Sequence, residues 1–270
     1  MKRNTFICLI ACGLCLFFLT ACPIKLREFD KRTRSYVLAF GETTVFPRMQ
    51  LTNNNNIILY WRAYEDVIWF RFQSTGFDKR RYDELAARYN DLNYYRVTTF
   101  SNISHNPLRM YISNRITSID VRSDTDFNAE HPAGASLSGF VRLLSASPMR
   151  FIESGYQDTF DWYNNYPTDF LRETYEFHRF IHSEWRRDRM VPLHQNHFPI
   201  SEVLSALEPN DFRLLGIGHT FPLPSGRVWF FGFLVFDKEP DSPGTHNLTV
   251  TIRRANGQTL TQMIEKTFGS

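Results

Sequence analysis

Most of the chain after residue 35 consists of short runs of aromatic and β-branched residues separated by turn-forming residues. Such runs are typical of β-strands, in which successive side chains point to opposite faces. In one of them, Phe70 and Phe72 alternate with Trp69 and Arg71, so that one face is apolar and the other mixed. The pattern predicts strands at residues 36–40, 57–64, 67–73, 108–112, 116–121, 212–217, 228–236, 248–253 and 259–264.

Two features of the C-terminal part refine this picture. The run Val228–Phe236 is apolar at every position except one glycine, which predicts a central strand covered on both faces. Asn256-Gly257 lies between the last two expected strands and predicts a hairpin turn. We therefore expect a mainly β, α+β fold with antiparallel strands. The run from Gly244 to Ile252 followed by this turn is similar to the last strands of an immunoglobulin-like β-sandwich.

Helical periodicity is limited to a few segments. Residues 78–92 place Tyr82, Leu85, Ala86 and Tyr89 on one face, which predicts a helix that packs against the sheet. A short helical turn is also expected at residues 201–207.

A longer amphipathic helix is expected at residues 169–187, within an insertion at 156–200. Thr168 can cap its start, and Pro192 prevents its continuation. We expect this helix to dock on its own domain, with a partner protein or a membrane surface as the alternatives.

The first 22 residues carry a targeting signal. The basic pair Lys2-Arg3 is followed by an uncharged apolar run at 6–19, a layout typical of secretory signals and too short for an ordinary spanning helix of about 20 residues. The closing tetrad Leu19-Thr20-Ala21-Cys22 resembles the lipobox of bacterial lipoproteins. The resemblance implies that residues 1–21 are removed and that Cys22 is acylated, for example with palmitate. A plain signal peptide and an uncleaved anchor are the alternatives.

The expected mature chain begins with a polar tether at residues 22–35. Residues 36–270 follow as one β-rich domain, or as two domains that divide near residue 106 into 36–106 and 107–270. Cys22 is the only cysteine left after the signal is removed, so no internal disulfide is expected and stability must come from a hydrophobic core.

The charge balance excludes one class of partner. Loss of Lys2 and Arg3 with the signal lowers the formal net charge from +3 to +1. Nucleic-acid-binding proteins usually carry a strong basic excess, so no nucleic-acid partner is expected.

Two stretches of the chain resemble an uncharacterised family of Bacteroidetes-type lipoproteins. One runs from Ile116 to Leu137 and includes the segment His131-Pro132-Ala133-Gly134; the other runs from Gly244 to Leu260. The resemblance implies a lipoprotein without assigned catalytic residues. Pro23 stands where an acidic residue would follow Cys22. By resemblance to lipoprotein sorting in Gram-negative bacteria, this favours the outer membrane. In Bacteroidetes-type lipoproteins an acid-rich run at this place favours export to the cell surface, so its lack here favours the periplasmic face.

Three aromatic residues are candidates for ligand binding. Trp162, Tyr163 and Tyr166 precede the insertion helix in no strong pattern, so we expect them to be exposed and able to stack on sugar rings. For any one of them taken alone, however, ordinary packing is favoured over ligand binding. These residues favour a binding or structural module that holds a glycan, a peptide or an envelope protein.

Four histidines form a candidate metal site. His178 and His182 are one helical turn apart, and His194 and His197 follow closely, which gives four nitrogen ligands suited to zinc. However, the residue after His178 is Arg179, where zinc proteases need a glutamate. The alternative is that the first two histidines border a buried face and the last two lie in a polar loop.

A calcium site in the loop 124–138 is a weaker hypothesis. Asp124, Asp126 and Glu130 supply oxygen ligands, but Ala129 and Ala135 occupy the positions at which an EF-hand loop needs glycine and glutamate. We expect a turn-rich loop instead.

The alternative to a binding module is an envelope hydrolase, either directed at glycans through paired carboxylates or dependent on metal held by the histidines. The chain has no Gly-x-Ser-x-Gly motif and no glycine-rich phosphate loop. The sequence therefore favours a non-enzymatic module without a cofactor, whose expected partners are the membrane, through the lipid, and a glycan or an envelope protein.

Overall fold

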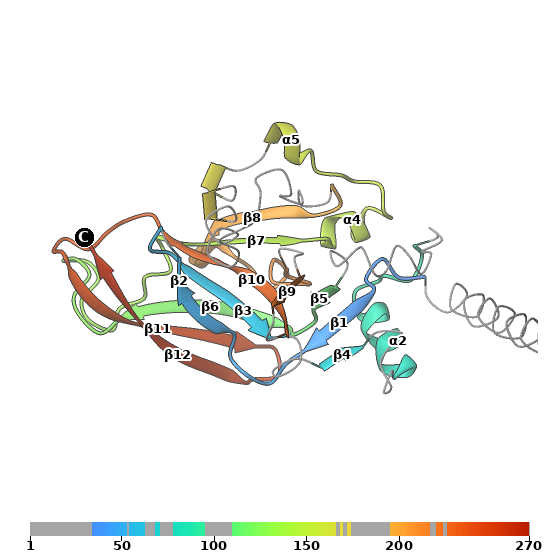
Figure 1. The fold of residues 1–270 in the computed structure, drawn as a ribbon, viewed down its shortest axis with the longest axis horizontal. Helices are drawn as coiled ribbons and strands as arrows, with labels where there is room; N and C mark the ends of the chain where they lie inside the picture. Colours follow the sequence, from blue (N-terminus) through green and yellow to red (C-terminus); the bar gives the residue numbers. More distant parts are fainter. Residues whose placement is uncertain are drawn as a thin grey trace, which may run out of the picture.

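The computed structural model describes residues 34–52, 54–62, 68–70, 78–94, 110–165, 168–169, 172–173, 195–216, 220–223 and 226–269. These residues form three β-sheets with short helices around them (Figure 1). Every pairing between the strands described is antiparallel except the one that joins β1 (Ala39–Glu42) to β5 (Met110–Ile112). The predicted mainly β, α+β fold with antiparallel strands is therefore confirmed.

The largest sheet is built around β10 (Gly226–Phe236), as the apolar run predicted. Its strand order is β2-β3-β10-β7-β8, and β9 pairs with the first part of β10. The bounds of the other strands are Arg48–Leu51 for β2, Ile57–Arg62 for β3, Val141–Ser147 for β7, Phe198–Val203 for β8 and Thr220–Leu223 for β9. Because β2 and β3 precede residue 106 and the other strands follow it, both halves of the chain contribute to one sheet.

A glycine allows β7 to approach β10 closely. A β-bulge interrupts the pairing of β10 with β3 at Gly232, and a Cβ atom at this position would lie 2.7 Å from the carbonyl oxygen of Leu144. The neighbouring Phe231 and Phe233 are buried in different hydrophobic clusters. The central strand is thus covered on both faces.

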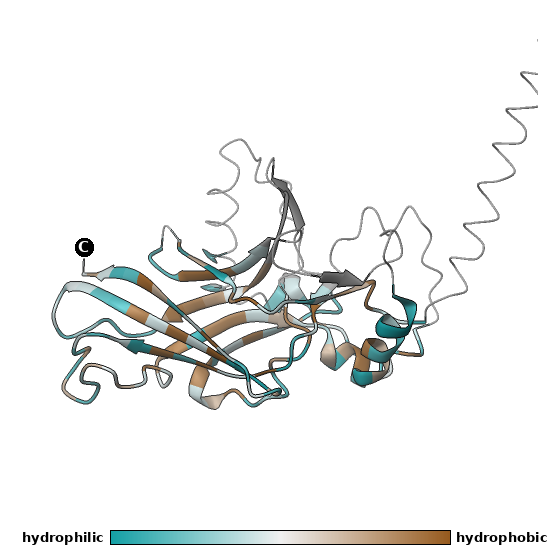
Figure 2. Ribbon diagram, turned by 90° about the horizontal axis from the view of Figure 1, so that it is seen from below, coloured by the Kyte–Doolittle hydropathy of each residue, from teal (hydrophilic) through white to brown (hydrophobic). Residues whose placement is uncertain are grey.

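The second sheet has the order β12-β11-β6, with bounds Thr259–Phe268, Gly244–Arg254 and Ile116–Ser123. The predicted hairpin is confirmed, since β11 and β12 pair on either side of Gly257, whose φ is +83°. Buried side chains of this sheet and of the large sheet form one cluster. The two sheets are therefore packed in a sandwich-like arrangement, and Figure 2 shows how their ribbons lie. Members of this cluster include Ile57, Trp61, Val121, Leu143, Phe231, Leu234, Val250 and Ile252. The immunoglobulin-like arrangement stays a prediction.

The third sheet is small and carries the predicted helix. Its order is β4-β1-β5, with β4 at Ile68–Phe70. Helix α2 (Lys79–Arg88) begins after Asp78, whose side chain accepts a hydrogen bond from the Arg81 amide at 3.0 Å. Its apolar face packs on Phe40 of β1 and on Tyr111 of β5 in one buried cluster, so the prediction of a packing helix is confirmed.

The region between residues 140 and 216 departs from the predictions. Strand β7 was not predicted, and β8 occupies residues expected to begin a helical turn; only Leu204–Ala206 (η3) is helical there. The strand predicted at 212–217 is wrong for residues 212–214, which form a turn. Two short helices, α4 (Met149–Glu153) and α5 (Trp162–Asn165), were also not predicted.

The long helix predicted at 169–187 lies mostly outside the described residues. Of its cap and this range the structure describes 168–169 and 172–173, and all four residues are helical.

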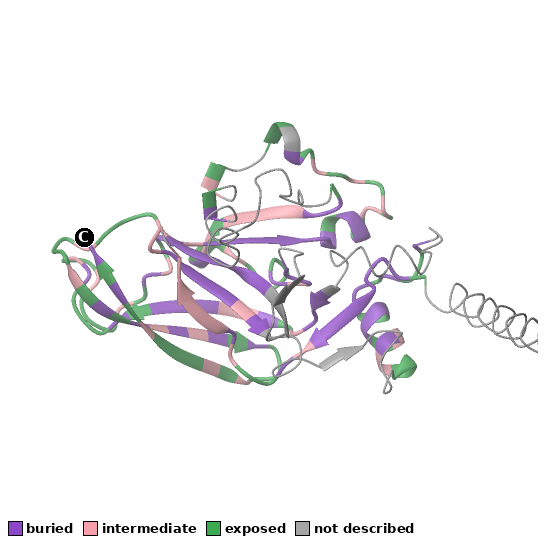
Figure 3. Cartoon of the chain, viewed as in Figure 1, coloured by how far each residue is buried: buried purple, intermediate pink, exposed green. Residues whose placement is uncertain are grey.

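Burial differs sharply between the strands (Figure 3). Strands β1 and β7 are almost wholly buried, whereas β12, at the edge of its sheet, is mostly exposed or half-buried. Within the described part of the chain, no helix is both long enough and apolar enough to cross a membrane.

Candidate functional site

A polar hollow of about 360 Å³ lies where α2 and β1 meet the end of the β6-β11-β12 sheet. We call it the arginine hollow. Its lining comes from the end of β1, from α2, from the connection between β5 and β6, and from the end of β11 with its turn. The lining residues are Glu42, Arg81, Arg88, Ser113, Asn114, Arg115, Arg254, Ala255 and Asn256.

Helix α2 contributes two of the arginines. Arg81 and Arg88 are seven residues apart, close to two helical turns, and therefore lie on the same side of the helix. The guanidinium of Arg81 donates to Glu42 through Nε at 3.3 Å and through Nη2 at 2.5 Å. These hydrogen bonds to the Glu42 carboxylate raise the pKa of Arg81. Arg81 Nη1 also pairs with Glu84, which lies outside the lining, at 3.3 Å. Arg81 is therefore held by two carboxylates, of which Glu42 belongs to the wall of the hollow.

The connection between β5 and β6 gives the hollow a fixed wall. The Ser113 hydroxyl donates to the Gly41 carbonyl at 2.9 Å, and the Ser113 carbonyl accepts a hydrogen bond from the Tyr89 hydroxyl at 2.7 Å. The side chain of Asn114 accepts from the Thr43 amide at 3.0 Å and donates to the Thr43 carbonyl at 2.9 Å. These bonds tie the connection to both β1 and α2.

Arg254 is the buried member of the set, with 7% of its surface exposed. Its Nη1 donates to the Thr43 carbonyl and to the Gln258 side chain, both at 2.8 Å. Its Nε has no hydrogen-bond partner among the residues described. Burial lowers the pKa of Arg254. Within the described part of the chain this guanidinium is held by neutral acceptors, and no carboxylate there compensates its charge.

Arg88 and Arg115 are exposed and form no ion pair within the described part of the chain. The carbonyl of Arg115 accepts the Ala255 amide at 2.9 Å, which joins this wall to the turn after β11. Among the described residues, four guanidinium groups and one carboxylate therefore line the hollow, and three of these guanidinium groups have no carboxylate partner there.

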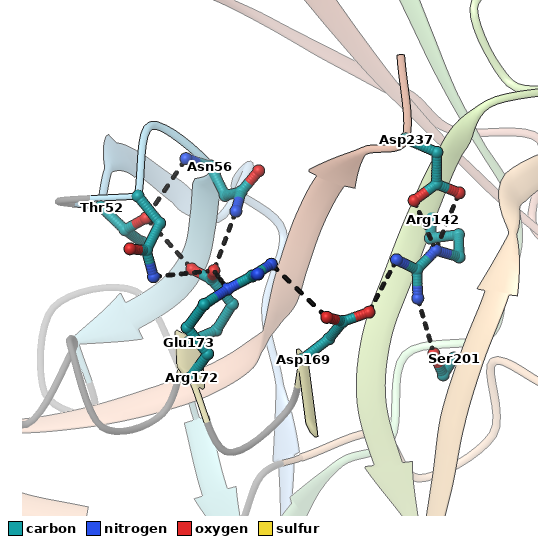
Figure 4. Close-up of polar contacts among 9 residues, drawn as sticks. Thr52, Asn56, Arg142, Asp169, Arg172, Glu173, Ser201 and Asp237 are labelled. Atoms are coloured by element: carbon teal, nitrogen blue, oxygen red, sulfur yellow. Dashed lines mark hydrogen bonds and ion pairs between the residues drawn. The ribbon is translucent and has the colours of Figure 1, made fainter. Parts of the chain in front are cut away.

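A second polar region, by contrast, is fully paired (Figure 4). Arg142 on β7 donates to Asp237 at 2.7 and 2.8 Å, to Asp169 at 2.8 Å and to Ser201 at 3.0 Å. Burial lowers the pKa of Arg142, but the hydrogen bonds to these two carboxylates raise it above its ordinary value.

Glu173 lies beside this arginine network and is fully buried. It accepts hydrogen bonds from Thr52 at 3.1 Å, Asn54 at 3.0 Å and Asn56 at 2.9 Å, and it lies 3.4 Å from Arg172 Nε. The asparagine loop between β2 and β3 thus binds a carboxylate of the insertion, which indicates a structural role.

Of the predicted sugar-binding residues, only Trp162 has a described side chain. It is buried, with 4% of its surface exposed, and its Nε1 donates to the His197 carbonyl at 2.9 Å. The expectation that Trp162 is exposed is therefore wrong, because packing against Phe160 and this hydrogen bond bury its ring. The side chain of Tyr163 and all of Tyr166 lie outside the described residues.

The proposed histidine cluster can be placed at one position only. His178, His182 and His194 lie outside the described residues, as does Cys22. His197 is fully buried, and its Nε2 is hydrogen-bonded to the Tyr111 hydroxyl. Among the described residues, no group of three or more histidine, cysteine, aspartate or glutamate side chains could hold a metal ion.

The acidic loop 124–138 uses its side chains to shape turns. Asp124 accepts the Asn247 amide at 2.9 Å and Asp126 accepts the Ala133 amide at 2.7 Å. Hydrogen bonds from Asn247 lower the pKa of Asp124. These contacts agree with the expected turn-rich loop.

A serine–histidine contact exists but lacks the geometry of a catalytic triad. His246 Nδ1 lies 2.8 Å from the hydroxyls of both Ser123 and Thr125. Ser123 is buried, and in the described part of the chain no carboxylate is bonded to His246. A triad needs an accessible serine and an acid that orients the histidine, so this contact indicates a packed polar pair.

No family model, no curated protein and no solved structure matches the chain. The resemblance to Bacteroidetes-type lipoproteins therefore stays a prediction, and the site must be judged from its own geometry.

Proposed function

We propose that the protein is a lipid-anchored module of a bacterial cell envelope that binds a ligand and performs no chemistry of its own. The anchor is assigned to Cys22 on its lipobox-like context, and the binding site is assigned to the arginine hollow. The observation that carries the binding assignment is the surplus of positive charge in that hollow: among the described residues that line it, Glu42 is the only carboxylate, and it is already paired with Arg81.

The way in which the chain enters the domain supports a tethered role. Asp91, fully buried beyond the end of α2, accepts the amides of Tyr36 at 2.8 Å and Val37 at 2.9 Å. It also accepts the hydroxyls of Ser35 and, at 3.0 Å, Tyr156. We call this arrangement the Asp91 clamp. It attaches the first described residues to the folded domain rather than leaving them as a continuation of the tether.

The clamp also limits how far the domain can lie from its anchor. Twelve peptide units separate Cys22 from Arg34, the first described residue, and a fully extended chain spans about 3.3–3.6 Å per residue, hence about 40 Å in total. An acylated Cys22 would therefore keep the domain close to the membrane surface, on the periplasmic face of the outer membrane in this proposal.

Membrane fractionation of cells that produce the wild type or Cys22→Ala tests the anchor. The wild type is expected in the detergent-extractable membrane fraction and Cys22→Ala in the soluble fraction. Protease added to intact cells should spare the domain, and the same protease should cleave it after lysis. A Cys22→Ala variant that stays firmly in the membrane fraction would contradict the lipid anchor, and cleavage in intact cells would contradict the periplasmic face.

A further inference from the structure

We propose that the arginine hollow binds the phosphate group of a phosphorylated ligand, with Arg88, Arg115 and Arg254 as the groups that hold it. This inference deepens the proposed function, because it names the ligand class of the binding module. It does not depend on the lipid anchor or on the side of the membrane.

The charge of the hollow favours a dianion over a monoanion. After the Arg81–Glu42 pair is set aside, three guanidinium groups lack a carboxylate partner in the described part of the chain. A carboxylate ligand would bring one negative charge, whereas a phosphate monoester brings about 1.5 to 2 near neutral pH. A phosphate monoester therefore matches the surplus more closely.

The three arginines also suit the shape of a phosphate. A guanidinium presents several N–H donors in a planar fork, which matches phosphate oxygens in pairs. The arginines come from α2, from the β5–β6 connection and from the end of β11, so they approach from different elements. Phosphate has three terminal oxygens that can accept such bonds at the same time.

The hollow is organised before any ligand binds. Hydrogen bonds between Asn114 and Thr43 fix one wall, and those of Arg254 with Thr43 and Gln258 fix another. Because these groups are already ordered, little conformational entropy would be lost there on binding. The buried position of Arg254 also strengthens its attraction to an anion, since electrostatic interactions are less screened away from water.

The lining limits what else is recognised. None of the described residues that line the hollow is aromatic, so they offer no ring on which a sugar or a base could stack. A volume of about 360 Å³ accommodates a phosphate and a small organic group, near the lower end of the ~300–1,000 Å³ typical of ligand sites. We infer that the phosphate, and not the organic part, supplies most of the recognition.

Isothermal titration calorimetry on the full-length chain in non-ionic detergent tests this inference. The probes are inorganic phosphate, glycerol 3-phosphate and glucose 6-phosphate, with acetate and glucose as controls. We expect saturable one-to-one binding of phosphate and of at least one ester, at least tenfold weaker binding of acetate, and no binding of glucose. A preference for glycerol 3-phosphate would indicate a lipid headgroup as the source, and a preference for glucose 6-phosphate would indicate a phosphorylated sugar.

A charge-matched pair of double variants separates a site from a general attraction. Arg88→Gln/Arg115→Gln removes two charges from the hollow, and Arg80→Gln/Arg253→Gln removes two exposed charges from the same helix and from β11, outside the lining. The first variant should weaken phosphate binding at least tenfold and the second less than twofold. All four substituted arginines are exposed, so both double variants should retain the fold, which circular dichroism can check.

Two results would overturn the inference. One is equal weakening in both double variants, which would mean that only the overall charge attracts phosphate. The other is the absence of saturable binding for phosphate and both esters up to about 1 mM, a concentration at which even weak specific sites are occupied. Neither result bears on the anchor, which the Cys22→Ala fractionation tests separately.

Discussion

Two arginine-rich regions of this molecule differ in how their charged groups are paired. Around Arg142 each charged group has partners of opposite sign, and neighbouring Glu173 is surrounded by donors (Figure 4). In the arginine hollow, only Arg81 has a carboxylate partner among the described residues. The first region joins the insertion to the large sheet, whereas the second is an open surface with surplus charge.

The difference shows that pairing, rather than residue type, separates a structural polar region from a candidate binding site. Removing one member of a matched, buried network leaves its partners without their hydrogen bonds, which costs stability. Removing an exposed and unpaired charge costs little stability but removes attraction for a ligand. Stability and binding should therefore respond to different arginines.

Glu173→Ala should have the largest effect on stability. Thr52, Asn54 and Asn56 would lose their shared acceptor in a buried position, so the free energy of unfolding should fall by about 3 kcal/mol. Urea unfolding followed by circular dichroism measures this change. Glu202→Ala, an exposed position on β8, is the matched control and should change the value by less than about 0.5 kcal/mol. Similar losses in the two variants would contradict a structural role for the network.

Lys266 also contacts the loop between β2 and β3, and it should make the free energy of unfolding depend on pH. Its Nζ donates to the Asn55 carbonyl and lies 4.3 Å from the centre of the Phe268 ring, and burial lowers its pKa from 10.5 to about 8. Between these two values the unfolded chain binds more protons than the folded one, so stability should rise as the pH increases from about 8 to 10.5, by roughly 2–3 kcal/mol.

The comparison of wild type with Lys266→Met isolates this contribution. Tyr89, whose pKa burial raises to about 12, acts in the opposite direction above pH 10, but it does so equally in both proteins. The difference between the two free energies of unfolding, measured in urea at pH 7 to 10, should therefore change steadily above pH 8. A constant difference would show that Lys266 titrates normally.

Single arginine substitutions in the two regions should change the free energy of unfolding by different, smaller amounts. Arg142→Gln should lower the free energy of unfolding by about 1 kcal/mol, because charge-assisted hydrogen bonds are lost at a partly exposed site. Arg88→Gln should change it by less than about 0.5 kcal/mol, since Arg88 is exposed and has no ion pair within the described residues. If Arg88→Gln proved the more destabilising, the distinction between the two regions would fail.

The sequence predicted the elements whose pattern is local. Helix α2, the hairpin at Gly257 and the central strand β10 each follow from periodicity or turn chemistry within a few residues. Strand β7 was not predicted because polar residues interrupt its apolar run. In the structure, the hydroxyls of Ser145 and Ser147 donate to the carbonyls of Phe231 and Arg213, which are distant in sequence, at 2.6 and 2.7 Å. Such long-range partners leave no trace in the local pattern.

The candidate site could not be predicted from spacing. Its arginines are spread from Arg81 to Arg254, and the only local signal is the seven-residue interval between Arg81 and Arg88 on one helix. Conversely, the predicted exposure of Trp162 is wrong because its indole N–H donates to the carbonyl of His197, 35 residues later in the chain. Both outcomes depend on tertiary contacts that bring distant segments together.

Thermal unfolding in phosphate and in chloride at equal ionic strength tests the central claim most directly. A ligand that binds only the folded state raises its stability. The melting temperatures of the wild type and of Arg142→Gln should therefore rise in phosphate, and that of Arg88→Gln/Arg115→Gln should rise clearly less, because only the general stabilising effect of phosphate and weakened binding remain. Equal rises in all three proteins would contradict the assignment of the surplus charge in the hollow to ligand binding.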